Sequence, residues 1–154
     1  MDQEDKLHRS RTLEKAIAKK GAEDKYQIVW KSYQLDPDFP KNESHVSTKY
    51  LAERKGLAID QIESMCEHLT QQGKQYEIDF RFDQALTFNT FDAHRLIHWA
   101  GENGKADQLK EAFMVAYFTT GADLSKEENL LLVVESVGLN KDSAVEVLNS
   151  ELFA

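Results

Sequence analysis

Hydrophobic residues recur every three or four positions along most of this chain, which is the spacing of an amphipathic helix. Glycine follows several of these segments, as is common where a helix ends. Asp60 is the expected N-cap of one helix, because Glu63 three residues later completes a capping-box pattern. The other helices are predicted over residues 6–20, 47–55, from Thr90 or Asp92 to Glu102, and over residues 107–119, 125–137 and 141–152.

Two segments depart from the helical spacing. The run that starts at Tyr26 and ends at Leu35 is dense in β-branched and aromatic residues, and Pro37 closes it, so it predicts a strand. From Tyr76 to Phe82 apolar and polar residues alternate, which predicts an extended segment with one apolar face. The chain is therefore expected to be mainly α with one or two β-strands. Because an isolated strand pair is marginal in water, we expect the run from Tyr26 to Leu35 to pair with residues 76–82, to be buried by helices, or to join the same run of a second copy.

Composition narrows the class of protein. The 154 residues suggest one domain, and a net charge of −8 makes nucleic acid an unfavourable partner. Cys66 is the one cysteine, so this sequence holds neither a dithiol nor a cysteine-rich metal site. The charged start has no apolar run behind it, and no stretch is long enough to span a bilayer. These features predict a cytoplasmic protein with no membrane partner.

Chemistry-bearing motifs are few. His94 and His98 are spaced i, i+4, which suits a shared metal, but further ligands are missing and the histidines flank an apolar stripe, so no metal site is expected. No nucleotide-binding glycine motif is present, and no cofactor is expected. Cys66 lies on an apolar stripe with Ile62 and Leu69 and is interpreted as a core residue.

The most unusual stretch joins an extended segment to a helix at residues 86–96. One interpretation is a capped helix start with Phe88 and Phe91 in the core. The other is that Asn89, Thr90 and His94 point into a cleft, because helix N-termini attract anionic and polar ligands. The sequence leaves both interpretations open, and it offers no catalytic residue.

The same stretch carries a resemblance. The sequence Asn-Thr-Phe-Asp-Ala-His-Arg-Leu, from Asn89 to Leu96, resembles a motif in the helical insert of DsbA-like oxidoreductases of the FrnE type, relatives of 2-hydroxychromene-2-carboxylate isomerase. Further segments are similar in the family's order, so that the resemblance spans residue 11 to the end. These segments are residues 13–16, 30–37, 50–56 and 110–118.

The resemblance implies a thioredoxin-like fold with an inserted helical domain. Residues 1–45 would be a partial thioredoxin-like segment of helix, strand and proline loop, and residues 46–154 the helical insertion domain. The family exchanges disulfides with a Cys-x-x-Cys pair opposite a cis-proline. This sequence has Met-Asp-Gln-Glu-Asp-Lys-Leu-His-Arg-Ser where that pair is expected, and it ends before the expected cis-proline segment. The core is therefore expected to be incomplete.

Three hypotheses of function follow. The first is an oxidoreductase-family protein without dithiol activity of its own. The second is a helical interaction module that binds a partner or itself, in the latter case as a homodimer through the run from Tyr26 to Leu35. The third, which rests on kinship, is a glutathione-dependent isomerase-like protein that binds a thiol or glutathione near Asn89, Thr90 and His94.

Overall fold

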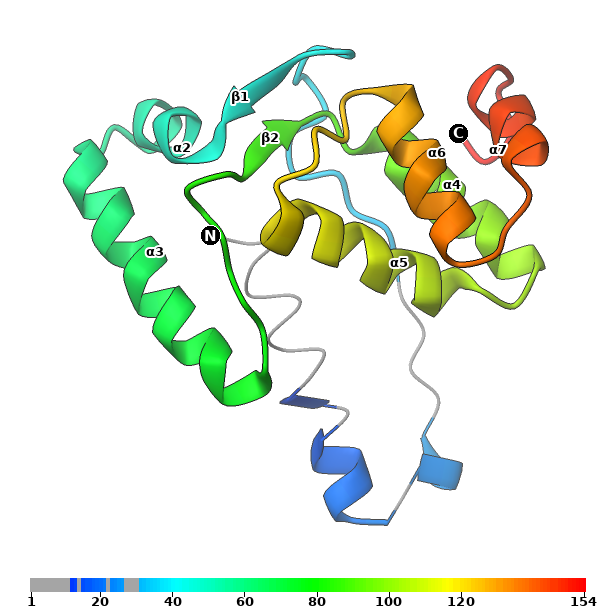
Figure 1. Cartoon of the computed structure of the whole chain (residues 1–154), viewed down its shortest axis with the longest axis horizontal. Coiled ribbons are helices and arrows are strands. Elements are labelled where there is room, and N and C mark those ends of the chain that lie inside the picture. Colours follow the sequence, from blue (N-terminus) through cyan, green and yellow to red (C-terminus); the bar gives the residue numbers. More distant parts are fainter. Residues whose placement is uncertain (1–11, 14, 22, 27–30) are drawn as a thin grey trace.

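The structure is a computed structural model that describes residues 12–13, 15–21, 23–26 and 31–154. Two antiparallel strands lie between a pair of helices, α2 and α3, and a group of four helices, α4 to α7 (Figure 1). The elements are η1 (Glu23–Lys25), β1 (Ser44–Val46), α2 (Ser47–Lys55), α3 (Ile59–Gly73), η2 (Lys74–Tyr76), β2 (Leu86–Phe88), α4 (Phe91–Glu102), α5 (Ala106–Val115), the π-helix η3 (Ala116–Thr120), α6 (Glu127–Ser136) and α7 (Lys141–Leu148).

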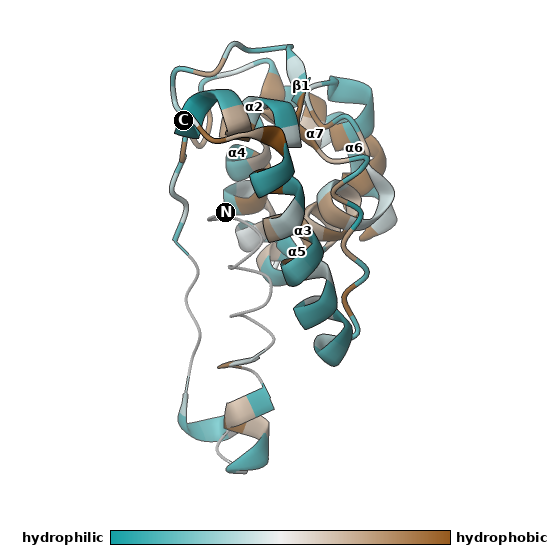
Figure 2. Cartoon of the chain, turned by 90° about the vertical axis from the view of Figure 1, so that its left-hand side faces the viewer, coloured by the Kyte–Doolittle hydropathy of each residue, from teal (hydrophilic) through white to brown (hydrophobic). Residues whose placement is uncertain are grey.

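The main hydrophobic core forms where α4 to α7 pack together. Each helix turns its apolar stripe inward, so the expected helical periodicity is confirmed in all four. Figure 2 shows polar residues on much of the outer surface of the helices. The buried members include Leu96, Trp99, Leu109, Phe113, Leu130, Leu131, Val134, Ala144 and Val147.

A second, aromatic core holds the segment that follows α3. Ile78, Phe80 and Phe82 are buried, whereas Asp79 between them is exposed, so the predicted apolar face is confirmed. These side chains pack with Phe118 of η3. The π-helix thus joins the two cores, because Tyr117 beside Phe118 packs against both of them.

The predicted strands are wrong in position. The segment from Ile78 to Arg81 forms no ladder, because Ile78 N–H donates to Gly73 O (3.0 Å) and Arg81 N–H to Phe118 O (2.7 Å). Residues 31–35 are not a strand either, and residues 27–30 lie outside the described residues. Within the described part of the chain, the paired strands are β1 and β2, with Ser44 opposite Phe88. Three-residue strands are too short to show a period of two.

Helix boundaries follow the sequence with corrections at four helices. The helix predicted over residues 107–119 is the α-helix α5 only as far as Val115 and continues as the π-helix η3 to Thr120. Residues 12–13 and 15–19 of the predicted first helix are helical, and the rest of it lies outside the described residues. Gly56 and Gly121 end their helices in the left-handed conformation, as expected. Asp60 is not an N-cap: α3 begins one residue earlier, and Ala58 N–H donates to Gln61 Oε1 at 3.0 Å. The helix α6 is shorter than predicted by two residues at its start and one at its end, and α7 stops at Leu148 rather than at residue 152.

Candidate functional site

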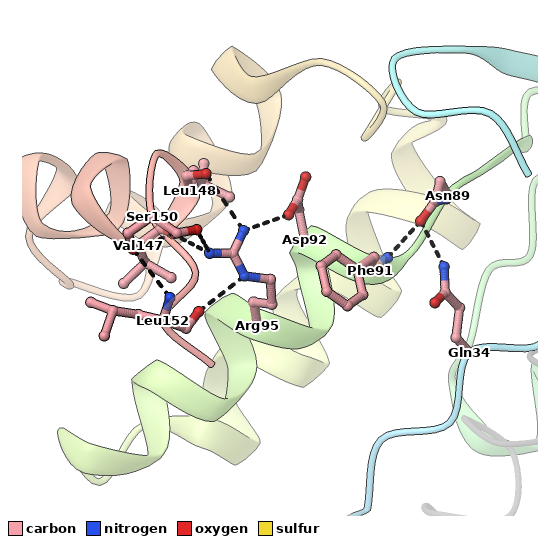
Figure 3. A network of polar contacts seen from close by, with 9 residues as sticks. All are labelled: Gln34, Asn89, Phe91, Asp92, Arg95, Val147, Leu148, Ser150 and Leu152. Carbon is pink, nitrogen blue, oxygen red and sulfur yellow. Dashed lines mark hydrogen bonds and ion pairs between the residues drawn. The ribbon is translucent and has the colours of Figure 1, made fainter. Parts of the chain in front are cut away.

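Asn89 precedes α4 and makes three hydrogen bonds with its side-chain amide, of which Figure 3 shows those to Phe91 and Gln34. Its Oδ1 accepts from Phe91 N–H (3.0 Å), which satisfies a backbone donor at the start of the helix. The same oxygen accepts from Gln34 Nε2 (2.7 Å), while Asn89 Nδ2 donates to Phe39 O (2.5 Å). The amide of Asn89 is therefore engaged with the protein itself, as the capped-helix interpretation expects.

Thr90 and His94 take part in the same helix start through the backbone. Thr90 occupies the N-cap position without a side-chain cap, and its carbonyl accepts from His94 N–H at 3.0 Å. His94 is half-buried one turn into α4, whereas His98 is exposed. The structure thus places Asn89, Thr90 and His94 at the start of α4, with Thr90 and His94 one turn apart. Their role as ligands for a thiol or glutathione stays a prediction.

Arg95 is the residue of this region that sequence reasoning missed. Its side chain is buried against the C-terminal end of α7, where backbone carbonyls surround the guanidinium (Figure 3). Nε donates to Leu152 O at 3.0 Å and Nη1 to Asp92 Oδ1 at 2.9 Å, and Nη2 donates to Val147 O and Ser150 O. The guanidinium satisfies carbonyls that the helix end leaves open. The sequence feature that could have indicated its burial is that a single arginine lies among the apolar, buried positions of α4.

Tyr50 on α2 anchors a second polar cluster. Its hydroxyl donates to Asp36 Oδ2, and Arg54 donates to the same carboxylate oxygen and to Tyr50 Oη (3.0 Å). Burial raises the pKa of the Tyr50 hydroxyl, the hydrogen bond to Asp36 adds to the rise, and Arg54 opposes it. The ring packs edge-to-face on Phe39 and on His45. The cluster holds the loop around Asp36 on α2, and this loop contains Pro37, which was expected to close a strand.

Cys66 lies in the middle of α3 and is half-buried against the aromatic core of Phe80 and Phe118. Reactive cysteines favour helix N-termini and cationic, partly exposed settings. The packing agrees with the interpretation of Cys66 as a core residue.

Among the residues that the structure describes, no three histidine, cysteine, aspartate or glutamate side chains group in a way that suits a metal ion. None of the described helices has the length and apolar character needed to cross a membrane.

A family model described as the DSBA-like thioredoxin domain matches residues 9–154. The chain therefore belongs to the DsbA-like thioredoxin family.

Among solved structures, the chain is similar to a probable DsbA oxidoreductase from Streptomyces coelicolor, with 26% identity and a TM-score of 0.87. The similarity covers 92% of this chain and 61% of that one. The chain thus spans less than two thirds of the Streptomyces protein. No curated protein matches this sequence.

Proposed function

We propose that this chain serves DsbA-like thiol–disulfide exchange of the FrnE type as a helical domain, and that by itself it has no dithiol activity. The observation that carries the proposal is the single cysteine, Cys66, in a chain of this family. Disulfide exchange needs one thiolate to attack a disulfide and a second thiol to resolve the mixed disulfide. One cysteine cannot supply both sulfur atoms.

The position of Cys66 supports the second half of the proposal. The residue lies in the middle of α3 rather than at a helix N-terminus, and it packs with apolar side chains such as Leu69 and Met114. Such an environment does not favour the thiolate that attacks a disulfide. A cytoplasmic location is part of the same proposal, because a lone cysteine suits a reducing compartment.

An insulin-reduction assay tests the absence of dithiol activity. With dithiothreitol as reductant, we expect the chain and its Cys66→Ser variant to leave the onset of insulin precipitation unchanged from the reductant alone. Faster onset with the original chain but not with Cys66→Ser would contradict the proposal and establish a single-thiol mechanism. Faster onset of insulin precipitation with both proteins would mean that the activity does not use the Cys66 thiol, because the Cys66→Ser variant has none.

Alkylation measures the setting of Cys66 directly. We expect iodoacetamide to modify Cys66 at least about tenfold more slowly in the native chain than in the chain unfolded by urea, since packing shields the thiol. Equal rates in the two states would show an accessible thiol and would count against the interpretation of Cys66 as a core residue.

Self-association is a second candidate function. Tyr26 and Tyr33 are 63% and 68% exposed, and both lie in the run for which pairing with a second copy is one of three expected outcomes. We expect light scattering to show a dimer at high concentration and Tyr33→Ser to weaken it. Leu132→Ser is the matched control, because Leu132 is an exposed apolar residue (59%) on α6. A monomer at all concentrations would exclude this function.

A further inference from the structure

The segment before β1 changes character at Gln34. Residues 31–33 are exposed, whereas Gln34, Leu35 and Asp36 are half-buried and Phe39 is only 4% exposed. A loop that hides side chains to this extent is held by contacts with the body of the protein. We name residues 34–39 the strap.

The side-chain amide of Asn89 forms hydrogen bonds with both ends of the strap. Gln34 Nε2 donates to its Oδ1 at 2.7 Å, and its Nδ2 donates to Phe39 O at 2.5 Å. Because Oδ1 also accepts from Phe91 N–H, the strap and the start of α4 share one amide group. Figure 3 shows Gln34 reaching across from the strap to this group.

A second attachment lies on α2. Asp36, in the middle of the strap, accepts from Tyr50 and Arg54, and the Phe39 ring lies 5.2 Å from the ring of Tyr50, centroid to centroid. Beyond the strap, Lys126 Nζ donates to Asn42 O at 3.2 Å. Together these contacts hold residues 34–42 to α2, to the start of α4 and to the turn that precedes α6, and the Phe39 ring also packs edge-to-face on His45 of β1.

We propose that Asn89 is a latch that fixes the strap to the N-terminal end of α4, so that the helical unit of this protein begins at Gln34 rather than at residue 46. The strap opens and closes as a local unit when the latch is broken, without unfolding of α4 to α7. Asn89 is a positioning residue in this device. The inference does not depend on the proposed function, because it rests on hydrogen bonds and burial.

Limited trypsin digestion of the full chain tests the latch. A protease needs several residues of extended chain around the cut, so cleavage after Lys41 requires the strap to leave α4, whereas cleavage after Lys31 does not. We expect cleavage after Lys31 to precede cleavage after Lys41. Asn89→Ala is expected to raise the rate at Lys41 about tenfold through the lost hydrogen bonds, with Lys31 unchanged.

Amide exchange by NMR gives an independent readout at one position. Phe39 N–H donates to Asp36 O within the strap (3.3 Å), so it is protected only while the strap is closed. We expect Asn89→Ala to speed its exchange about tenfold and to leave the amide of Val134, in the main core, unchanged.

Three variants separate the latch from a general effect on the fold. Asn103→Ala removes an amide at the other end of α4, where Nδ2 donates to Trp99 O at 3.3 Å, and should leave strap cleavage unchanged. Gln34→Ala removes one strap bond without altering the helix start, and should raise cleavage after Lys41 about threefold. Asn89→Asp keeps the acceptor but loses the bond to Phe39 O, so its effect should fall between those of Gln34→Ala and Asn89→Ala.

Two results would overturn the proposal. One is an unchanged rate at Lys41 in both Asn89→Ala and Gln34→Ala. The other is faster exchange at Val134 to the same extent as at Phe39, which would mean that Asn89 supports the whole fold and is not a local latch. If Asn89→Ala does not fold, the Gln34→Ala result decides alone.

Discussion

Replacing Arg95 by methionine keeps the aliphatic stem of the side chain in place and removes its charge and its hydrogen bonds. The Arg95 side chain is 5% exposed, and its N–H groups donate hydrogen bonds to the backbone carbonyls of Val147, Ser150 and Leu152. Hydrogen bonds to charged groups each contribute roughly 1.5–3 kcal/mol, and the carbonyls regain some water in the variant. We therefore expect Arg95→Met to lower the free energy of unfolding by about 3 kcal/mol.

Urea unfolding followed by far-UV circular dichroism measures this loss as a lower midpoint with an unchanged slope. For a chain of this length, about 3 kcal/mol corresponds to a melting temperature lower by roughly 6–12 °C. Arg95→Lys should lose about half as much, because an ammonium keeps the charge but not the planar fork of donors.

Asp92→Asn is the control that separates the carbonyl contacts from the ion pair. The Asp92 side chain is 35% exposed, so its pair with Arg95 is screened and its loss should cost less than about 1 kcal/mol. A loss below about 1 kcal/mol in Arg95→Met would refute the reasoning. An equal loss in Asp92→Asn would assign the effect to the ion pair instead.

Three further predictions concern other parts of the chain. Burial raises the pKa of Asp123, but hydrogen bonds from Ser125 and other groups outweigh burial and hold the pKa below the ordinary 3.8. The ionised carboxylate therefore stabilises the folded protein fully above pH 3.8, and this contribution is lost as the pH falls below that value. Acid titration should accordingly show a shallower loss of folding stability in Asp123→Asn than in the original chain. Gly121→Ala should cost about 2 kcal/mol in urea unfolding, because φ is +65° and a Cβ would lie 2.6 Å from Gln84 Cβ. Glutathione titration followed by NMR should shift amides near Asn89 if the ligand hypothesis holds, and unchanged amides there would end it.

Part of the candidate site was readable from the sequence. The turn into α4 was singled out because Asn89 and Thr90 are residue types that satisfy free N–H groups, and Asn89 does so. Its two bonds to the strap were not predictable, since they join positions that lie 50 and 55 residues apart. Local pattern identifies a residue that can cap a helix, but it does not identify a distant segment that the same amide holds.

Alternation predicted the burial of one segment correctly, but the backbone of that segment does not pair with a strand. Ile78, Phe80 and Phe82 are buried as their spacing predicts. Their backbone forms no strand, because α3 and η3 accept its N–H groups where a neighbouring strand was expected. Periodicity sets which side chains face the core, whereas a ladder also needs a second strand within reach.

The sequence by itself determined the helical periods, most helix ends and the family resemblance, because each of these is written in neighbouring residues. Gly56 and Gly121 end helices since glycine tolerates positive φ at little cost. Tertiary structure alone decided the pairing of β1 with β2, the early end of α7 and the burial of Arg95. A buried guanidinium is tolerated only where carbonyls and a carboxylate converge on it, and that convergence exists only after α4 and α7 have packed.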